Sequence, residues 1–264
     1  MDERSGTDQD GRRLVAELEE TLLLSGRDTD RIQVVGHRGA PAPGTVENSV
    51  AAVTEALLLG ADGVEIDVWL TEDGTLVCAH DLRTADRTSL ATLPEVLAAV
   101  QRHPGSAVVV EAKPVTDAAV ARATADALAD VLAAAAGADV NISSFDPALL
   151  AMIRTACADL PVRTALLGGK TDPADDVVRR AHEDGHDEVH LPLVAVRHAP
   201  EAVETARWLG LSVALWTVNR RTDLRWAAEL GVDAVITDDV LVAWSELDRA
   251  PIAEPAEAME LAAA

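Results

Sequence analysis

The sequence predicts an α/β fold of the (β/α)₈ TIM-barrel class, because short apolar runs alternate with longer helical stretches eight times. Strands linked by helices run parallel, and eight such units fit a barrel of typically about 250 residues. An open, doubly wound sheet is the alternative, but no G-x-G-x-x-G follows the first strand to support a dinucleotide-binding version. The expected units are 32–36 with 48–59, 63–70 (and a β-like return at 75–79) with 93–102, 107–112 with 116–136, 139–143 with 147–157, 162–167 with 174–184, 187–191 with 200–209, 212–217 with 222–230, and 233–237 with 239–248.

The barrel is expected over residues 31–249, with an extension before it and a tail after it. Residues 1–30 are expected to be partly disordered, with one amphipathic helix whose leucines recur every fourth position. The Pro- and Ala-rich residues 250–264 are expected to form a flexible tail. The acidic N-terminus is unlike a signal peptide, and no stretch approaches about 20 apolar residues. We therefore expect a cytoplasmic protein without stable membrane insertion.

The composition restricts the possible partners. A formal net charge of −23 argues against binding to nucleic acid or to an anionic membrane surface, since both require basic patches. An anionic substrate would need local positive charge, from a metal ion or from selected Arg and Lys side chains. The two cysteines are far apart and show no C-x-x-C spacing, which leaves a zinc ribbon or a disulfide scaffold unsupported. The sequence carries no signal for an oligomeric state.

The stretch Gly63–Leu70, G-V-E-I-D-V-W-L, places two carboxylates on one face of a strand. Glu65 and Asp67 are costly to bury together unless a cation or a proton compensates them. Taken alone, they equally describe a solvated acidic face. Glu111 and Lys113 share a face in the same way at the end of the next strand. Three carboxylates from neighbouring strands suit a hard divalent cation, Mg²⁺ or Ca²⁺.

Further polar residues follow the expected carboxyl ends of the strands, where barrels of this class hold their active sites. His37 and His80 suit acid–base chemistry near neutral pH. Arg38 and Lys113 supply positive charge for an oxyanion, in the first place a phosphate. Each residue alone has an ordinary explanation; Asn48, for example, would cap the following helix. Polar residues at seven carboxyl strand ends together favour an active site, and the amino-terminal ends show nothing comparable.

In chain order, these motifs resemble the glycerophosphodiester phosphodiesterase family over about residues 32–240. The resemblance implies a barrel of the PLC-like phosphodiesterase type and metal-dependent hydrolysis of a glycerophosphodiester to glycerol phosphate and an alcohol. The combination is specific, although each motif is weak alone. The matching motifs are V-V-G-H-R-G-A, V-E-N-S, G-A-D-G-V-E-I-D-V-W-L-T-E-D-G-T-L-V, A-H-D, D-R-T, L-P-E-V-L, V-E-A-K-P, S-S-F, W-T-V-N and G-V-D-A-V-I-T-D.

The resemblance also implies roles for individual residues. A hydroxyl next to the phosphate would attack, one His would take its proton, and the other would protonate the leaving alcohol. The resulting cyclic phosphate would then be hydrolysed. By position, the resemblance implies metal ligands at Glu65, Asp67 and Glu111, an acid–base pair at His37 and His80, phosphate contacts at Arg38 and Lys113, an alcohol contact at Trp216, and support of the first His by Glu47.

The chain departs from the family pattern in two loops. Asp86-Arg87-Thr88 is followed almost at once by Leu93–Leu97, where the family carries an insertion that covers part of the site. A more open site leaves room for lysolipid diesters, so a lysophospholipase D or sphingomyelinase D-like reaction that releases a cyclic phosphate is an alternative. The loop from His37 to Glu47 is one residue longer than usual and lacks the usual Pro. An inactive phosphate-ester binding protein is the alternative of another class, although no His or metal carboxylate is lost.

Overall fold

The computed structural model describes residues 31–86, 89–135 and 137–247. Its single sheet has nine strands, of which β3 (Leu76–Cys78) is antiparallel and the other eight are parallel. The parallel strands follow the order β1-β9-β8-β7-β6-β5-β4-β2, and β1 pairs with β2 to close the ring. This closure confirms the predicted barrel and excludes the open sheet. The barrel strands are β1 (Gln33–Gly36), β2 (Gly63–Leu70), β4 (Ala107–Ala112), β5 (Asp139–Ser144), β6 (Val162–Leu167), β7 (Glu188–Pro192), β8 (Ser212–Trp216) and β9 (Ala234–Thr237).

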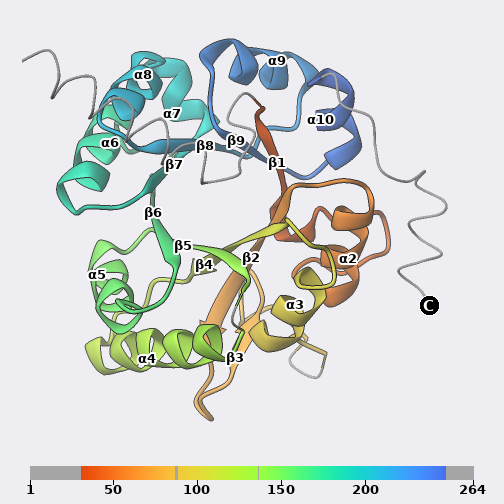
Figure 1. The fold of residues 1–264 in the computed structure, drawn as a ribbon, viewed down its shortest axis with the longest axis vertical. Helices are drawn as coiled ribbons and strands as arrows, with labels where there is room; N and C mark the ends of the chain where they lie inside the picture. Colours follow the sequence, from red (N-terminus) through yellow and green to blue (C-terminus); the bar gives the residue numbers. More distant parts are fainter. Residues whose placement is uncertain (1–30, 87–88, 136, 248–264) are drawn as a thin grey trace, which may run out of the picture. The chain divides into compact units, whose positions relative to one another are not determined.

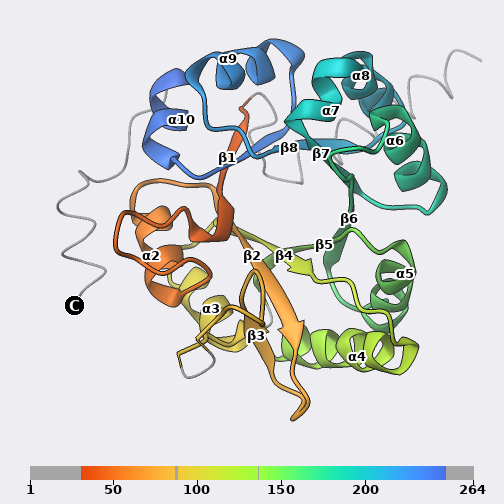
Figure 2. The ribbon, with the colours of Figure 1, turned by 180° about the vertical axis from the view of Figure 1, so that it is seen from behind.

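The helices form a ring outside the strands, as both views show (Figures 1 and 2). Most lie within two residues of the expected bounds. One short helix, α7, was not expected, because it spans less than two turns between two prolines and shows no clear periodicity. The expected extension 1–30 and tail 250–264 lie outside the described residues. The helices are α2 (Val50–Leu58), α3 (Leu93–Val100), α4 (Ala118–Ala134), α5 (Pro147–Ala156), α6 (Ala174–Glu183), α7 (Leu193–His198), α8 (Glu201–Trp208), α9 (Arg221–Leu230) and α10 (Val240–Glu246), with a 3₁₀ turn η1 (His37–Gly39).

The antiparallel strand β3 turns the chain back along β2 and delivers the loop that follows it to the carboxyl end of the barrel. The hairpin pairs Val68 with Cys78 and Leu70 with Leu76. Beyond the pairing, the Trp69 indole N–H donates to the Ala79 carbonyl at 2.9 Å. Trp69 therefore holds the residue that immediately precedes His80, a role that the sequence pattern does not indicate.

Apolar side chains fill the space between the strands and the surrounding helices. The largest fully buried ones include Ile66 on β2, Leu128 on α4 and Leu191 on β7. A much smaller cluster lies inside the ring, where Val35 and Ile236 pack with Val109 and Ala214. At about 25 cal/mol per Å² of buried apolar surface, the outer layer supplies most of the hydrophobic stabilisation.

The barrel interior also holds a polar group. This group corrects the expectation that the amino-terminal ends of the strands carry no comparable set of polar residues. The Arg163 Nε donates to Glu188 at 2.9 Å, and His190 lies 3.3 Å from the same carboxylate. Burial alone would raise the pKa of Glu188, but the hydrogen bond from His190 and the Arg163 charge lower it to about 2. The group escaped sequence analysis because Glu188 and Arg163 stand at the amino-terminal ends of β7 and β6, whereas the search for a site followed the carboxyl ends.

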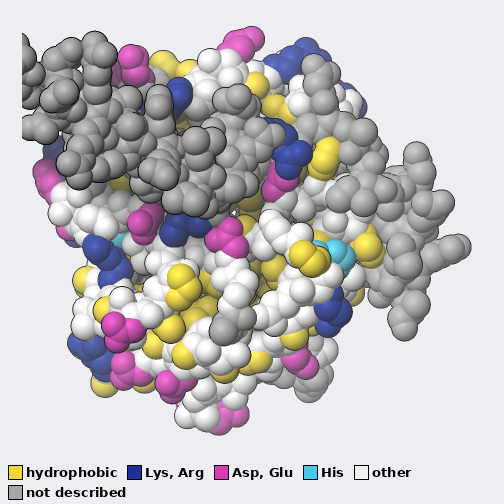
Figure 3. Space-filling view, in the orientation of Figure 1, with side chains coloured by type: hydrophobic (Ala, Val, Ile, Leu, Met, Phe, Trp, Pro, Cys, Tyr) yellow, Lys and Arg dark blue, Asp and Glu magenta, His cyan; other side chains and the backbone are white. Residues whose placement is uncertain are grey.

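The surface carries charges of both signs. On the face shown in Figure 3, basic and acidic side chains are interspersed around the rim. Within the described ranges, no helix combines the length and the apolarity that crossing a bilayer requires.

Close approach of β2 and β4 at Gly63 generates a stability prediction. A Cβ at Gly63 would lie 2.6 Å from the Ala107 carbonyl oxygen, which belongs to the paired strand and cannot move away freely. We expect Gly63→Ala to lower the free energy of unfolding by about 1–3 kcal/mol, measured by urea denaturation. Gly74→Asn, in the open β2–β3 turn, serves as the control for losing a glycine, because nothing lies within 4 Å of its Cβ position and Asn adopts its φ of +83° more readily than most residues. Equal loss in both variants would contradict this interpretation.

Candidate active site

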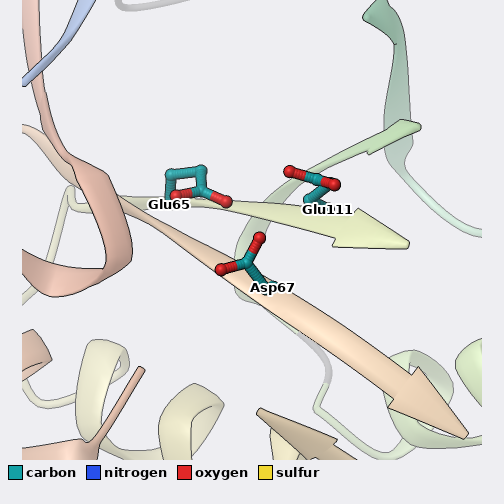
Figure 4. Close-up of side chains that lie close together, drawn as sticks. All are labelled: Glu65, Asp67 and Glu111. Carbon is teal, nitrogen blue, oxygen red and sulfur yellow. The ribbon is translucent and has the colours of Figure 1, made fainter. Parts of the chain in front are cut away.

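Three carboxylates meet at the carboxyl end of the barrel. Glu65 and Asp67 project from β2, and Glu111 projects from β4 toward them (Figure 4). The strand register makes Asp67 the direct neighbour of Glu111 and places Glu65 two residues earlier on the same face. One oxygen from each side chain lies within 4.8 Å of the others, and all three residues are buried.

The charges of this cluster are incompletely compensated. Among the described residues, the buried Glu65 Oε1 has no hydrogen-bond partner. Burial, together with the neighbouring charges of Asp67 and Glu111, raises the pKa of Glu65 well above its usual range. A divalent cation held by carboxylate oxygens would supply the missing positive charge. The donor set and the orphaned oxygen therefore fit a hard metal ion.

Lys113 is already part of this cluster. Its Nζ lies 2.5 Å from Asp67 Oδ1 and 2.6 Å from Glu111 Oε1. Burial would raise the pKa of Asp67, but the Lys113 ammonium and the Asn48 amide hold it below its ordinary value. For Glu111, burial outweighs the same ammonium, and its pKa is raised. The lysine thus compensates one carboxylate well and the second only in part.

Asn48 has a role in the cluster that sequence analysis missed. Its amide Nδ2 donates to Asp67 Oδ2 at 2.8 Å, and its Oδ1 accepts the Asp67 backbone N–H at 2.8 Å. The expectation that Asn48 caps the helix is wrong, since Ser49 alone accepts from the Ala52 N–H. Asn48 has a φ of 57°, a conformation that Asn adopts more readily than most residues. The sequence feature that could have pointed to this role is an Asn directly before a Ser that already caps the helix.

His37 is oriented by a carboxylate from the far end of the chain. Its Nδ1 lies 2.6 Å from Asp238 Oδ1, and its Nε2 lies 4.0 Å from Glu65. The Asn219 amide donates to the other Asp238 oxygen at 2.6 Å, while Asn219 Oδ1 accepts the Asp238 backbone N–H at 2.9 Å. The hydrogen bond with His37 lowers the pKa of Asp238, so this carboxylate stays ionised behind the ring.

The expected partner of His37, Glu47, lies elsewhere. Its carboxylate accepts two hydrogen bonds from the Arg38 guanidinium, at 3.0 and 3.2 Å. The Asn48 backbone N–H donates to the Arg38 carbonyl at 2.9 Å, which brings the end of the longer loop beside Arg38. Arg38 also reaches the metal cluster, because its backbone N–H donates to Glu65 at 3.0 Å and its Nε lies 3.4 Å from Asp67. Glu47 thus positions Arg38 instead of His37.

His80 lies near Asp67, on the loop that follows β3. Its Nδ1 is 3.6 Å from Asp67 Oδ2 and 3.5 Å from Lys113 Nζ, and about half of its side chain is exposed. His37 and His80 are therefore both within a few ångströms of the carboxylate cluster but reach it from different loops. Two ionisable rings beside a cluster of charged groups can take and give protons.

A cavity of about 390 Å³ opens above these groups. One wall is apolar and includes Phe145 and Trp216, whose rings meet edge to face with centroids 5.8 Å apart. The Trp216 indole N–H donates to the His190 carbonyl at 3.3 Å, which fixes the ring against the barrel. The lining residues are His37, Arg38, Glu65, His80, Glu111, Lys113, Ser143, Phe145, Leu167, Lys170, His190, Trp216, Thr217 and Ile236.

Comparison with known families matches this site to one of them. The model of the "Glycerophosphoryl diester phosphodiesterase family" matches residues 37–93 and 86–242. A "Probable glycerophosphodiester phosphodiesterase 1" of Mycobacterium tuberculosis is 61% identical over 56 residues, which are 21% of this chain and 20% of that protein. The match thus spans about a fifth of the length of this curated relative.

Solved structures show the same fold. A glycerophosphodiester phosphodiesterase from Parabacteroides distasonis superimposes with a TM-score of 0.73 at 22% identity, covering 83% of this chain and 98% of that chain. An Oleispira antarctica phosphodiesterase, in complex with the product sn-glycerol-3-phosphate, gives a TM-score of 0.68 at 21% identity, covering 82% and 96%. These likenesses establish that the barrel is shared with proteins of this kind.

The uncompensated charge on Glu65 predicts a link between cation binding and stability. Because burial raises its pKa, Glu65 ionises more readily in the unfolded chain than in the folded protein. Stability therefore falls progressively as pH rises from the ordinary glutamate range towards the raised value. We expect Glu65→Gln to raise the melting temperature in chelator at neutral pH by about 2–4 °C, for roughly 1 kcal/mol. We also expect Mg²⁺ or Ca²⁺ to raise the melting temperature of the wild type, and Glu65→Gln to abolish that rise.

The control for this experiment is Glu72→Gln, in the exposed β2–β3 turn. It makes the same chemical change outside the cluster and should keep the wild-type response to the cation. A Glu65→Gln protein that is stabilised by the cation as much as the wild type would refute the assignment of the cluster.

Proposed function

Because the chain belongs to the glycerophosphoryl diester phosphodiesterase family, we propose that it is a metal-dependent phosphoric diester hydrolase. Its substrate is a small glycerophosphodiester, and its products are glycerol phosphate and an alcohol. The product complex of the Oleispira antarctica relative supports this substrate class. Such a reaction would place the protein in lipid and glycerol metabolism.

The observation that carries the proposal is the convergence of Glu65, Asp67 and Glu111 within reach of two histidines. A phosphodiester is an anion, and it would be repelled by three carboxylates that lack a compensating cation. One Mg²⁺ or Ca²⁺ ion, held by these three residues, would polarise the phosphoryl oxygens when bound. Arg38 and Lys113 then face the same anion from the protein side.

The two histidines divide the proton transfers. Asp238 holds the Nδ1 side of His37, so its Nε2 faces the cavity and takes the proton of the attacking substrate hydroxyl. His80, half-exposed beside Lys113, gives a proton to the oxygen of the leaving alcohol. A cyclic phosphate forms, and reversed proton transfers allow water to open it. Trp216 contacts the organic part of the substrate along the apolar wall.

Lysolipid diesters are a second candidate substrate class, and the apolar wall favours them. Phe145 is 37% exposed although it is the only Phe in the chain. An exposed ring beside Trp216 offers a surface for hydrocarbon. With such substrates the reaction would be of the lysophospholipase D or sphingomyelinase D type, and it would stop at the cyclic phosphate.

Phosphorus NMR of a substrate panel tests the proposed reaction. Purified protein with Mg²⁺ or Ca²⁺ should convert short glycerophosphodiesters to glycerol phosphate, and chelator should stop the conversion. Accumulation of a cyclic phosphate from lysolipids would favour the second candidate. Survival of every diester, with measurable ligand affinity, would show an inactive binding protein and sink the hydrolase proposal.

Single substitutions test the proton transfers. We expect His37→Ala and His80→Ala to lower kcat by about 10²–10⁴-fold, and Asp238→Asn by at least about tenfold because His37 loses its orientation. His182→Ala, on the exposed surface of α6, provides the matched control. Melting temperatures establish that each variant is folded. Unchanged kcat in either active-site His variant would rule out that histidine as an acid or base.

A further inference from the structure

Both lysines of the chain lie on one cavity. The sequence contains only Lys113 and Lys170, against a net charge of −23. Lys113 belongs to the carboxylate cluster, whereas Lys170 follows β6 and lines the cavity from there. In the ring of strands, β6 lies four positions from β1 in either direction, so the Lys170 loop stands across the barrel from His37 and Arg38.

The loop that carries Lys170 is held in place. The Gly168 N–H donates to the His190 carbonyl at 2.9 Å, and the Gly169 N–H donates to Asp172 at 2.8 Å. The Asp172 N–H in turn donates to the Gly169 carbonyl at 3.1 Å. A Cβ at Gly169 would lie 2.9 Å from the Asp172 carboxylate, so a side chain at this position would disturb the turn. The loop therefore fixes where the lysine side chain begins.

Lys170 differs from the other cations of the cavity in its charge balance. Arg38 is paired with Glu47 and Asp67, and Lys113 with Asp67 and Glu111. Throughout residues 31–86, 89–135 and 137–247, by contrast, no carboxylate forms an ion pair with Lys170. It is exposed, so keeping its charge requires no partner. Its positive charge is available to a bound molecule.

The cavity lining also contributes apolar side chains beside the cluster and the lysine. Phe145 and Trp216 form its aromatic part, and Leu167 lies at the end of β6 just before the Lys170 loop. A bound molecule would meet cationic and metal-binding groups at one end, an apolar surface in the middle, and a single ammonium at the other end. This arrangement suits a chain of carbon atoms with an anion at both ends.

We propose that Lys170 is a specificity-determining residue that binds a second anionic group, a phosphate monoester or a carboxylate, on the organic arm of the diester substrate. The proposal rests on the proposed hydrolase function and narrows its substrates to diesters that carry an additional negative charge. The same ammonium disfavours arms that end in a quaternary ammonium, by repulsion of like charges.

A matched pair of substrates tests the proposal. The first is the diester of two glycerols, and the second is the same diester with a terminal phosphate monoester. The wild type should prefer the phosphorylated diester in kcat/KM, and Lys170→Gln should reduce that preference by about tenfold. Lys170→Arg should retain most of it, and Lys170→Glu should reverse it. Raising the ionic strength to about 0.15 M should weaken the wild-type preference.

Arg179→Gln is the control, because it removes the same charge from α6, outside the cavity. A preference that stays at the wild-type value in Lys170→Gln, while the neutral diester is hydrolysed, overturns the lysine assignment and leaves the hydrolase intact. Equal loss in Arg179→Gln and Lys170→Gln also overturns it, since the effect would then be one of net charge.

Binding of product analogues tests the role of Lys170 even if the protein hydrolyses neither diester. Calorimetry with Mg²⁺ compares the Kd values of glycerol phosphate and glycerol bisphosphate for the wild type and Lys170→Gln. Loss of the bisphosphate preference in the variant supports the lysine assignment even if neither diester is hydrolysed, an outcome that would refute the hydrolase alone. The same Kd ratio in both proteins overturns the assignment.

Discussion

The register between β2 and β4 is the constraint on which the rest of the site depends. It makes Asp67 and Glu111 direct neighbours and leaves Glu65 on the same face, so three negative charges share one buried region. Isolated charges in such surroundings cost several kcal/mol each. The surrounding groups reduce that cost for Asp67, which receives both the Lys113 ammonium and the Asn48 amide. Among the described residues, the one hydrogen bond that Glu65 accepts comes from the Arg38 backbone N–H, and its other oxygen has no hydrogen-bond partner. Of the three carboxylates, Glu65 therefore has the greatest need of a cation.

Unusual backbone conformations are concentrated in the loop between β1 and α2. Among the described residues, the three non-glycine residues with positive φ are Arg38, Ala40 and Asn48, and all lie in this loop. Gly39, between two of them, packs so closely on α2 that a Cβ would lie 2.8 Å from Ala52. Such conformations persist where the surrounding structure determines them, and they are frequent at functional sites. Here they direct Arg38 and Asn48 toward the carboxylates.

The sequence was informative where regular periodicity decides the geometry. The period of two in Gly63–Leu70 predicted that Glu65 and Asp67 share a face, and the eight βα units predicted the barrel that brings Glu111 beside them. It was uninformative where irregular loops determine which side chains meet. Glu47 meets Arg38 instead of His37 because of backbone hydrogen bonds within an irregular segment. Asp238 is the last residue of the G-V-D-A-V-I-T-D motif, but only closure of the ring shows which histidine it contacts.

That closure has a consequence for partly synthesised or truncated chains. His37 and Asp238 are 201 positions apart, and they meet only after β9 has paired with β1. His37, directly after the first strand, thus obtains its orienting carboxylate from the last βα unit of the barrel. Until that unit is in place, the ring is open at the same seam and the histidine lacks its partner. Pairing of β9 with β1 therefore completes the barrel and gives His37 its orienting carboxylate in the same step.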